Sequence, residues 1–115
     1  MRFLIGIIVL SLVACGYSEK GVNGGNLHQS NGLAYYRGEQ RPYTGWMHHE
    51  LGGKKVLGYW ENGLREGKWR IWYESGQLSL EENYKEGEYH GTRKLWYSDG
   101  TLEEKSIYRD GIEVE

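Results

Sequence analysis

The sequence has 115 residues and a formal net charge of −2 at pH 7, which limits it to one small domain with appendages. Its 18 glycines and single proline favour short strands and tight turns over helices. The near-neutral charge and the lack of a basic run argue against a nucleic-acid-binding groove, so nucleic acid is not an expected partner. Five tryptophans and ten tyrosines supply most of the large side chains, and their polar tips suit a half-solvated β-sheet.

The N-terminal segment has the features of an export signal. Met1-Arg2 gives a short positive start, and residues 3–13 are almost wholly apolar but too few for a membrane span of about 20 residues. The sequence Leu12-Val13-Ala14-Cys15 resembles the bacterial lipobox. This resemblance implies that residues 1–14 are a signal peptide cleaved between Ala14 and Cys15, and that acyl chains such as palmitate on Cys15 anchor the protein to a membrane. The alternative is an ordinary secretory signal ending in a free cysteine, since Cys15 is the single cysteine and has no disulfide partner in the chain.

Residues 15–32 are rich in glycine, asparagine and serine and show no hydrophobic periodicity. They predict a lipidated N-terminus followed by a flexible tether, which would hold the domain within about 20–25 Å of the membrane. Gly16, rather than an aspartate, follows Cys15. By resemblance to Gram-negative lipoproteins this favours the outer membrane, and the expected location is the bacterial cell envelope.

From residue 33 to residue 115 the chain carries regularly spaced turn signals, each ending in glycine. Such pairs favour two-residue hairpin loops, because glycine and asparagine tolerate positive φ. Strands of about eight to eleven residues between them predict an all-β domain, an antiparallel hairpin meander without helices. The turn signals are Gly52-Gly53, Asn62-Gly63, Ser75-Gly76, Glu86-Gly87, Asp99-Gly100 and Asp110-Gly111.

The chain also repeats itself, because GKWRIWYESGQL at residues 67–78 returns as GTRKLWYSDGTL at residues 91–102. With Ser75-Gly76 as the loop, alternation places Trp69 with Ile71, Tyr73 and Leu80 on an apolar face. The opposite face is mixed, and Trp72 is expected there opposite Ser79. A repeat of two strands should also align aromatic side chains into ladders, one of them containing Trp60, Tyr84 and Tyr108. Arg93 departs from this pattern, because it takes the place of Trp69.

These motifs resemble the MORN repeat in the variant form found in bacterial proteins that are often labelled antitoxin-like. The resemblance rests on Gly-x-x-x-x-Trp-Tyr-x-x-Gly-x-Leu at Gly67 and Gly91, on Tyr-x-x-Gly at Tyr84 and Tyr108, and on residues 42–45, and it covers residues 35–115. It implies hairpins stacked into one elongated, twisted sheet, and interaction rather than catalysis. No functional residue of the family can be carried over.

Three groups of polar residues could suggest chemistry, and none has the required spacing. His48-His49-Glu50 places only His48 and Glu50 on one side of a strand, which is too few ligands for zinc. The others are two acidic pairs whose members diverge and two serines without a histidine and aspartate: Glu81-Glu82, Glu103-Glu104, Ser75 and Ser98. We therefore expect no enzyme activity, cofactor or metal, and no small-molecule substrate.

The remaining functional signal is a stripe of aromatic and basic residues on the mixed face: Lys68, Arg70, Trp72, Lys94 and Trp96. Such residues anchor protein interfaces, although a thin sheet also needs large side chains on both faces for stability. Two functions are compatible with it. The first is a lipid-anchored module, antitoxin- or immunity-like, that binds a protein partner at the cell envelope. The alternative is a glycan- or peptidoglycan-binding module.

Overall fold

The computed structural model describes residues 21–114, and these form an all-β structure, as predicted. The elements are β1 (Val22–Asn23), the 3-10 turn η1 (Gly24–Asn26), β2 (Leu27–Ser30), β3 (Leu33–Tyr36), β4 (Gly45–Leu51), β5 (Lys54–Glu61), β6 (Leu64–Trp72), β7 (Leu78–Lys85), β8 (Glu88–Tyr89), β9 (Gly91–Trp96), β10 (Leu102–Arg109) and β11 (Ile112–Glu113). No helix in this part of the chain is long and apolar enough to cross a membrane. The predicted signal peptide, with Ala14 and Cys15 at its cleavage site, lies outside the described residues.

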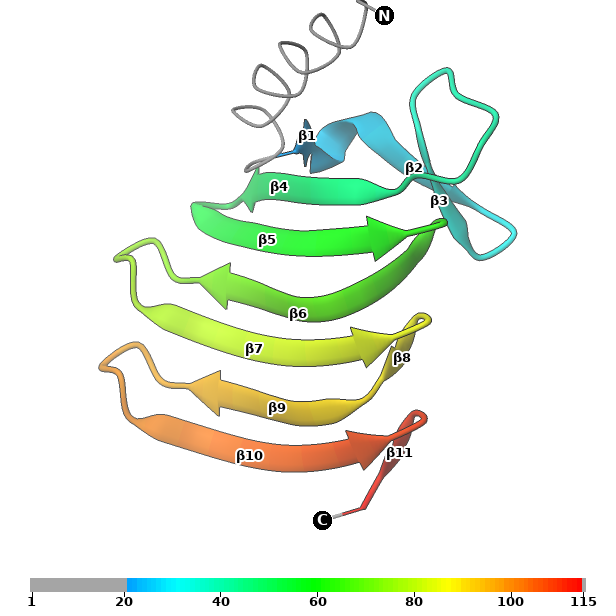
Figure 1. Cartoon of the computed structure of the whole chain (residues 1–115). Helices are drawn as coiled ribbons and strands as arrows, with labels where there is room; N and C mark the ends of the chain where they lie inside the picture. The colour runs from blue at the N-terminus through cyan, green and yellow to red at the C-terminus, as the bar shows by residue number, and fades with distance from the viewer. Residues whose placement is uncertain (1–20, 115) are drawn as a thin grey trace, which may run out of the picture.

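Nine strands form one long sheet in the order β1-β4-β5-β6-β7-β9-β10-β11, with β8 paired to β7. The pairs are antiparallel except β1 with β4, which is parallel. Successive hairpins stack into a curved, elongated sheet (Figure 1). The predicted hairpin meander is therefore confirmed.

The hairpin turns of the sheet have two conformations. At Asn62-Gly63 and Glu86-Gly87 both residues have positive φ, 50° and 83° in the first turn and 51° and 86° in the second, as primed two-residue turns require. At the opposite side, only Gly76 has positive φ in the loop after β6. This loop is three residues long, because the N–H of Tyr73 donates to the carbonyl of Gln77 at 2.8 Å.

The predicted positive φ of Gly76 and Gly100 is confirmed, with values of 97° and 95°. The predicted two-residue loops at these glycines are wrong, since Ser75 and Asp99 keep negative φ. Their side chains instead accept hydrogen bonds from the backbone two residues further on, at 3.3 Å for Ser75 and 2.9 Å for Asp99. Serine and aspartate stabilise turns in this way without positive φ.

The predicted register is confirmed in the middle of β6 and β7, where Trp69 lies opposite Glu82 and Ile71 opposite Leu80. It is wrong at the end of the pair, where Trp72 lies opposite Leu78 rather than Ser79. A β-bulge explains the shift, because one extra residue of β7 is left without a partner. The same irregularity recurs in β9 and β10, between the partners of Trp96 and Leu95.

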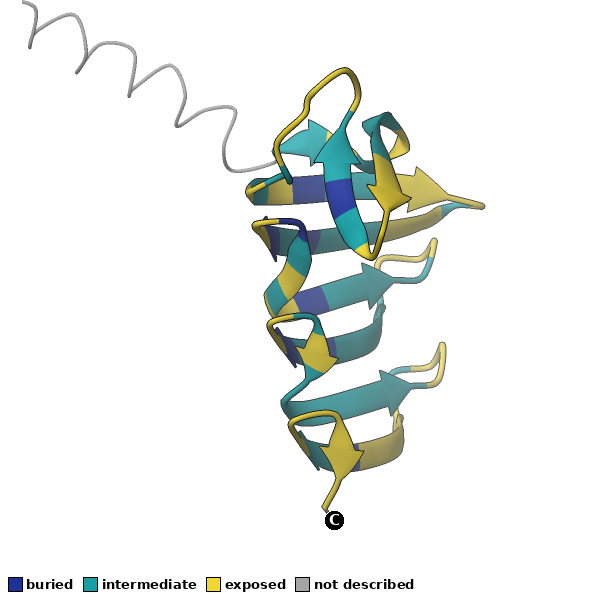
Figure 2. Ribbon diagram, turned by 90° about the vertical axis from the view of Figure 1, so that its right-hand side faces the viewer, coloured by how far each residue is buried: buried dark blue, intermediate teal, exposed yellow. Residues whose placement is uncertain are grey.

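The described part of the predicted tether, residues 21–32, has regular structure instead. β1 extends the sheet beside β4, and β2 pairs with β3 through a turn at Asn31-Gly32, where φ is 53° and 81°. The β2–β3 hairpin crosses one face of the sheet at its N-terminal end (Figure 2). The glycine and asparagine residues that suggested flexibility here form turns. Residues 21–32 therefore belong to the folded domain, which the sequence analysis had begun at residue 33.

A line of aromatic rings runs along the covered face of the sheet and forms most of its core. Consecutive ring centroids lie 5.2, 6.0, 5.1 and 4.8 Å apart, and the rings belong in order to Trp60, Trp69, Tyr84, Tyr89 and Tyr108. We call this line the aromatic spine and its side of the sheet the core face. The predicted ladder of Trp60, Tyr84 and Tyr108 is confirmed as part of this spine.

Gly58 gives Trp69 its place in the spine. A Cβ atom at Gly58 would lie 2.2 Å from the Cδ2 atom of the indole, far closer than packed atoms approach. The indole nitrogen of Trp69 donates to the carbonyl of Tyr59 at 3.1 Å, which fixes the ring over the glycine. The buried Trp69 is thus held in place by the space that Gly58 leaves for its ring and by its hydrogen bond to the carbonyl of Tyr59.

Candidate binding face

The face opposite the aromatic spine contains a row of side chains that crosses five strands. Neighbours in this row are directly opposite one another in the register, and the row runs Leu57, Arg70, Glu81, Lys94, Lys105 from β5 to β10. We call this side of the sheet the mixed face. The charge changes sign from Arg70 to Glu81 and again from Glu81 to Lys94, and the row ends in the basic pair Lys94 and Lys105.

All five residues of the predicted stripe belong to the mixed face. Lys68, Arg70 and Trp72 alternate along β6, while Lys94 and Trp96 do so along β9. Lys68 is exposed and the other four are half-buried. The structure therefore brings the stripe together on one surface, with the two indoles at the same ends of their strands.

A hollow of about 580 Å³ lies at the Trp72 end of this region. The residues around it come from β4, β5, β6 and the following loop, and include His48, Glu50, Lys55, Leu57 and Trp72. In the register His48 is opposite Leu57, Glu50 is opposite Lys55, and Lys55 is opposite Trp72, so these five side chains share the mixed face. An indole beside both acidic and basic groups can contact a partly polar ligand.

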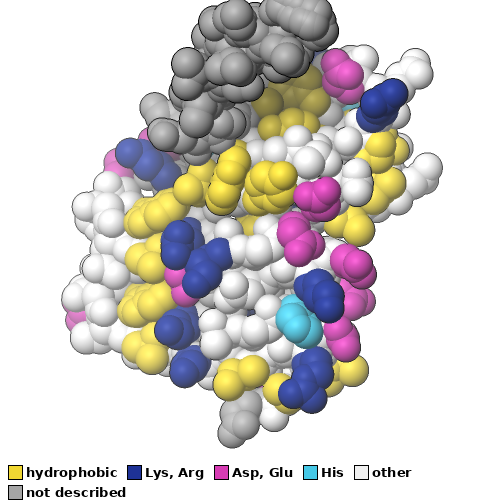
Figure 3. Space-filling model, viewed as in Figure 1, with side chains coloured by type: hydrophobic (Ala, Val, Ile, Leu, Met, Phe, Trp, Pro, Cys, Tyr) yellow, Lys and Arg dark blue, Asp and Glu magenta, His cyan; other side chains and the backbone are white. Residues whose placement is uncertain are grey.

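The row on the mixed face contains more basic than acidic residues. Arg70 donates to Glu81 at 2.9 Å, and this is the one salt bridge among the residues of the row within residues 21–114. No carboxylate of the described residues pairs with Lys94 or Lys105. The space-filling view in Figure 3 shows basic side chains gathered in a column beside hydrophobic ones, with acidic side chains towards the other side of the same face.

The core face contains a charged cluster that the sequence pattern did not reveal. Glu82 is buried and accepts hydrogen bonds from the Tyr84 hydroxyl at 2.7 Å, the Tyr89 hydroxyl at 3.0 Å and Arg93 Nε at 2.9 Å. Every contact is internal, so the cluster stabilises the sheet between the two repeats. The arginine at position 93, where the preceding repeat has tryptophan, was the available sequence signal for a buried ion pair.

The titration of two residues reflects this cluster. Burial raises the pKa of Tyr84 well above its ordinary value, and the hydrogen bond to the Glu82 carboxylate adds to the rise. Burial opposes the charge of Arg93, but its hydrogen bond to Glu82 leaves the pKa raised overall. Tyr84 therefore stays neutral and Arg93 stays charged at physiological pH, as a structural ion pair requires.

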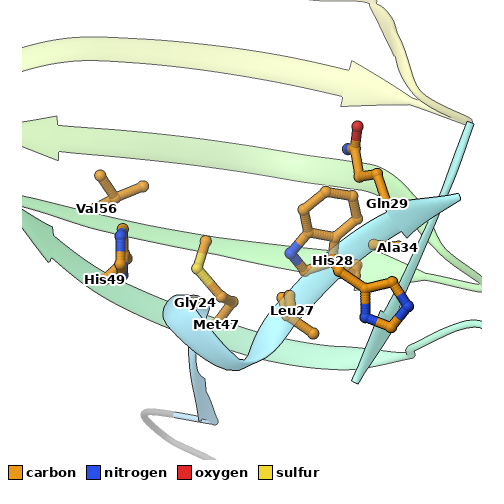
Figure 4. Close-up of a pocket in the computed structure, with 9 residues that line it drawn as sticks. Gly24, Leu27, His28, Gln29, Ala34, Met47, His49 and Val56 are labelled. Carbon is orange, nitrogen blue, oxygen red and sulfur yellow. The ribbon is translucent and has the colours of Figure 1, made fainter. Parts of the chain in front are cut away.

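A second cavity, of about 250 Å³, lies between the β2–β3 hairpin and the core face (Figure 4). Its lining is mainly apolar and includes Leu27, Ala34, Met47 and Val56. His49 also lines this cavity, and its Nδ1 atom is fully buried without a hydrogen-bond partner among the described residues. This cavity offers no set of converging polar groups.

Residues 21–114 contain no group of three or more histidine, cysteine, aspartate or glutamate residues that could hold a metal. His48 and Glu50 share a face as the sequence indicated, while the neighbouring side chain of His49 belongs to the core face. Ser75 and Ser98 are both exposed, in the loops after β6 and β9.

Two consecutive segments of the chain, residues 65–86 and 89–110, match the MORN repeat variant. Both segments are similar to MORN repeats. Each begins where a strand enters the sheet from a primed turn and ends at the next such turn, so the match coincides with one hairpin unit of the structure. MORN repeats are commonly non-catalytic modules for interaction or membrane binding. Comparison with characterised proteins and with solved structures gives no match.

Proposed function

We propose that this protein is a non-catalytic interaction module that binds a protein partner through the mixed face of its MORN repeats. The observation that carries the proposal is the pair of half-buried indoles, Trp72 and Trp96, on a face with unpaired lysines. Tryptophan combined with basic residues is enriched at interfaces, where a few such anchors supply most of the binding energy.

The test compares the two faces of the sheet. A double variant, Trp72→Ala with Trp96→Ala, should abolish capture of a partner from solubilised cell envelope while leaving the melting temperature close to that of the wild type. Trp69→Ala, on the core face, serves as the matched control and should lower the melting temperature strongly. If the double variant unfolds as readily as Trp69→Ala, the mixed face is a second core and the proposal fails.

We further propose that acylation of Cys15 holds the module at the bacterial cell envelope. The support is the lipobox-like sequence Leu12 to Cys15 behind an apolar run. The wild-type protein should take up a radiolabelled fatty acid and fractionate with membranes, and Cys15→Ala should prevent both. If the wild-type protein takes up no acyl label, the anchoring proposal fails and an ordinary secretory signal explains the N-terminal segment.

An antitoxin-like or immunity-like role is the specific form of the proposal that the family label suggests. It requires that the captured partner is toxic when expressed without this protein. Co-expression with the captured partner should then restore growth of the host, and the Trp72→Ala, Trp96→Ala double variant should not. If the double variant also restores growth, an antitoxin-like role does not depend on the mixed face.

A glycan is the second candidate ligand, favoured by the hollow beside Trp72. Sugar rings stack on exposed indoles, and the acidic and basic residues around the hollow, Glu50 and Lys55 among them, could bind hydroxyl groups. Sedimentation with isolated peptidoglycan tests this directly. Binding that is lost in Trp72→Ala but retained in Trp96→Ala would support the glycan site over a protein interface that spans both indoles.

A further inference from the structure

Lys94 and Lys105 are directly opposite each other on β9 and β10. Like charges in this position destabilise a strand pair, because the two side chains project side by side from the same face. On the other side of Lys94 lies Glu81, but its carboxylate is bonded to Arg70 at 2.9 Å. Within residues 21–114 the lysine pair therefore lacks a neutralising partner.

The first repeat shows what the fold does at the same positions. Counting back 24 residues, Lys94 corresponds to Arg70 and Lys105 to Glu81, and these two form the cross-strand salt bridge. The sheet thus accommodates an oppositely charged pair at this place. The second repeat replaces the acidic partner with a lysine, which lowers the stability of the isolated domain and leaves two positive charges beside Trp96.

We propose that Lys94 and Lys105 form an anion-binding site for the carboxylates of an acidic protein segment, with an apolar side chain of that segment packing on Trp96. The inference rests on the proposed interaction function and names the chemistry of its partner. Trp96 follows Lys94 by two residues on the same face, so an apolar and an ionic contact can be made together. Ammonium groups are point charges that pair with carboxylates in varied geometries, which suits a flexible acidic segment.

A single substitution separates binding from stability. Lys105→Glu gives Lys94 the opposite charge that Arg70 has in the first repeat, so the melting temperature should stay the same or rise. A random copolymer of glutamate and tyrosine serves as the probe, since it presents carboxylates and aromatic groups on one flexible chain. Its binding to the full-length protein in detergent, followed by calorimetry, should weaken about tenfold or more in Lys105→Glu and should weaken with added salt in the wild type.

Lys54→Glu is the matched control, because it makes the same change in net charge on the core face, where Lys54 lies 5.8 Å above the ring of Tyr73. It should bind the copolymer as the wild type does. Failure of the wild type to bind the copolymer, equal binding by Lys105→Glu, or a lower melting temperature of Lys105→Glu would overturn the anion site.

Vesicles containing phosphatidylserine form a second arm of the experiment. If they bind the wild type while the copolymer does not, the anion is a lipid headgroup and the acidic segment is ruled out. None of these results depends on capture of the envelope partner. If the Trp72→Ala, Trp96→Ala double variant still loses that partner while Lys105→Glu retains it, the interaction function survives and this inference alone fails.

Discussion

The two MORN-like repeats place an arginine and an aromatic ring at the same two positions, but in opposite order. In the first repeat Arg65 lies over the ring of Trp69, with 5.9 Å from Cζ to the ring centroid. In the second repeat Tyr89 takes the first position and Arg93 the second, with the guanidinium 5.7 Å from the ring. The repeat therefore preserves a cation beside an aromatic ring rather than a fixed residue at each position.

The exchange changes how the core face is held together. In the first repeat the aromatic side chain occupies the centre of the sheet, where Gly58 makes room for it. In the second repeat the arginine occupies the centre and binds the buried Glu82. One junction is thus stabilised by packing and the other by a buried ion pair, and the two should respond differently to substitution.

The largest effect is expected at the packed junction. Trp69→Ala removes a side chain that is 9% exposed and contacts two other rings of the spine. Unfolding in guanidinium chloride should show a loss of roughly 3 kcal/mol or more, the usual range for a core aromatic residue. A loss below about 1 kcal/mol would show that this face is not the core.

The buried ion pair should be nearly as sensitive when only one partner is removed. Glu82→Ala leaves Arg93 and two tyrosine hydroxyls without their acceptor, and should destabilise the domain by about 2–3 kcal/mol. The double variant Glu82→Leu with Arg93→Met should recover most of this loss, because no charge then remains buried. Equal losses for single and double variants would contradict a coupled pair.

Gly58→Ala tests whether Trp69 needs the space that the missing side chain of Gly58 leaves. The added methyl group would overlap the indole, so the expected loss is about 1–3 kcal/mol, as for other overpacked cores. Combining it with Trp69→Leu, whose smaller side chain leaves room, should give less than the sum of the two single losses. Additive losses would mean that the glycine acts through its backbone rather than by close approach.

Gly76→Val forces a β-branched residue into positive φ, 97°, and should cost more than about 1 kcal/mol in thermal or chemical unfolding. Open space surrounds the missing Cβ, so strain in the backbone is the sole cause of the loss. Gly100→Val, at φ 95°, should lose at least as much stability, because a Cβ atom there would also lie 3.1 Å from Oε1 of Gln77. Unchanged stability in both variants would contradict the turn assignment.

The smallest loss of stability is expected when Tyr73 is changed, and Tyr97, its counterpart in the second repeat, provides the comparison. The hydroxyl of Tyr73 donates to the carbonyl of Trp96 at 2.6 Å and so links the two repeats. Tyr73→Phe should lower stability by about 1 kcal/mol, the usual contribution of one hydrogen bond. Tyr97 is 52% exposed, and Tyr97→Phe should change stability by less than about 0.5 kcal/mol. Equal effects would show that the link contributes nothing.

The sequence was sufficient to predict the strands, the meander and the core face, because glycine turns and alternating side chains are local signals. It misplaced Trp72 by one residue, since a bulge adds a residue without leaving a mark in the pattern. It also took residues 21–32 for a tether, because β1 and β2 are short and β1 pairs with β4, which is distant in the sequence.

The stripe on the mixed face followed from alternation alone, and all five of its residues share that face. The lysine pair could not be recognised in the same way. Only the register shows that Lys105 is opposite Lys94, and only the Arg70–Glu81 bridge shows what the equivalent position normally holds. The buried Glu82 was likewise hidden, since an acidic residue in a strand is usually solvated.

Because the strands follow one another in a linear order, local unfolding of the sheet should start at one of its ends. Each hairpin contacts mainly its neighbours, so strands separate most readily at an end that little else covers. At the N-terminal end of the described residues the β2–β3 hairpin seals the spine, with Ala34 fully buried against it. At the other end Ile112 is 69% exposed. Local unfolding should therefore begin at β11 and continue to β10, which places Lys105 on one of the first strands to open and Trp69 among the last residues to be released.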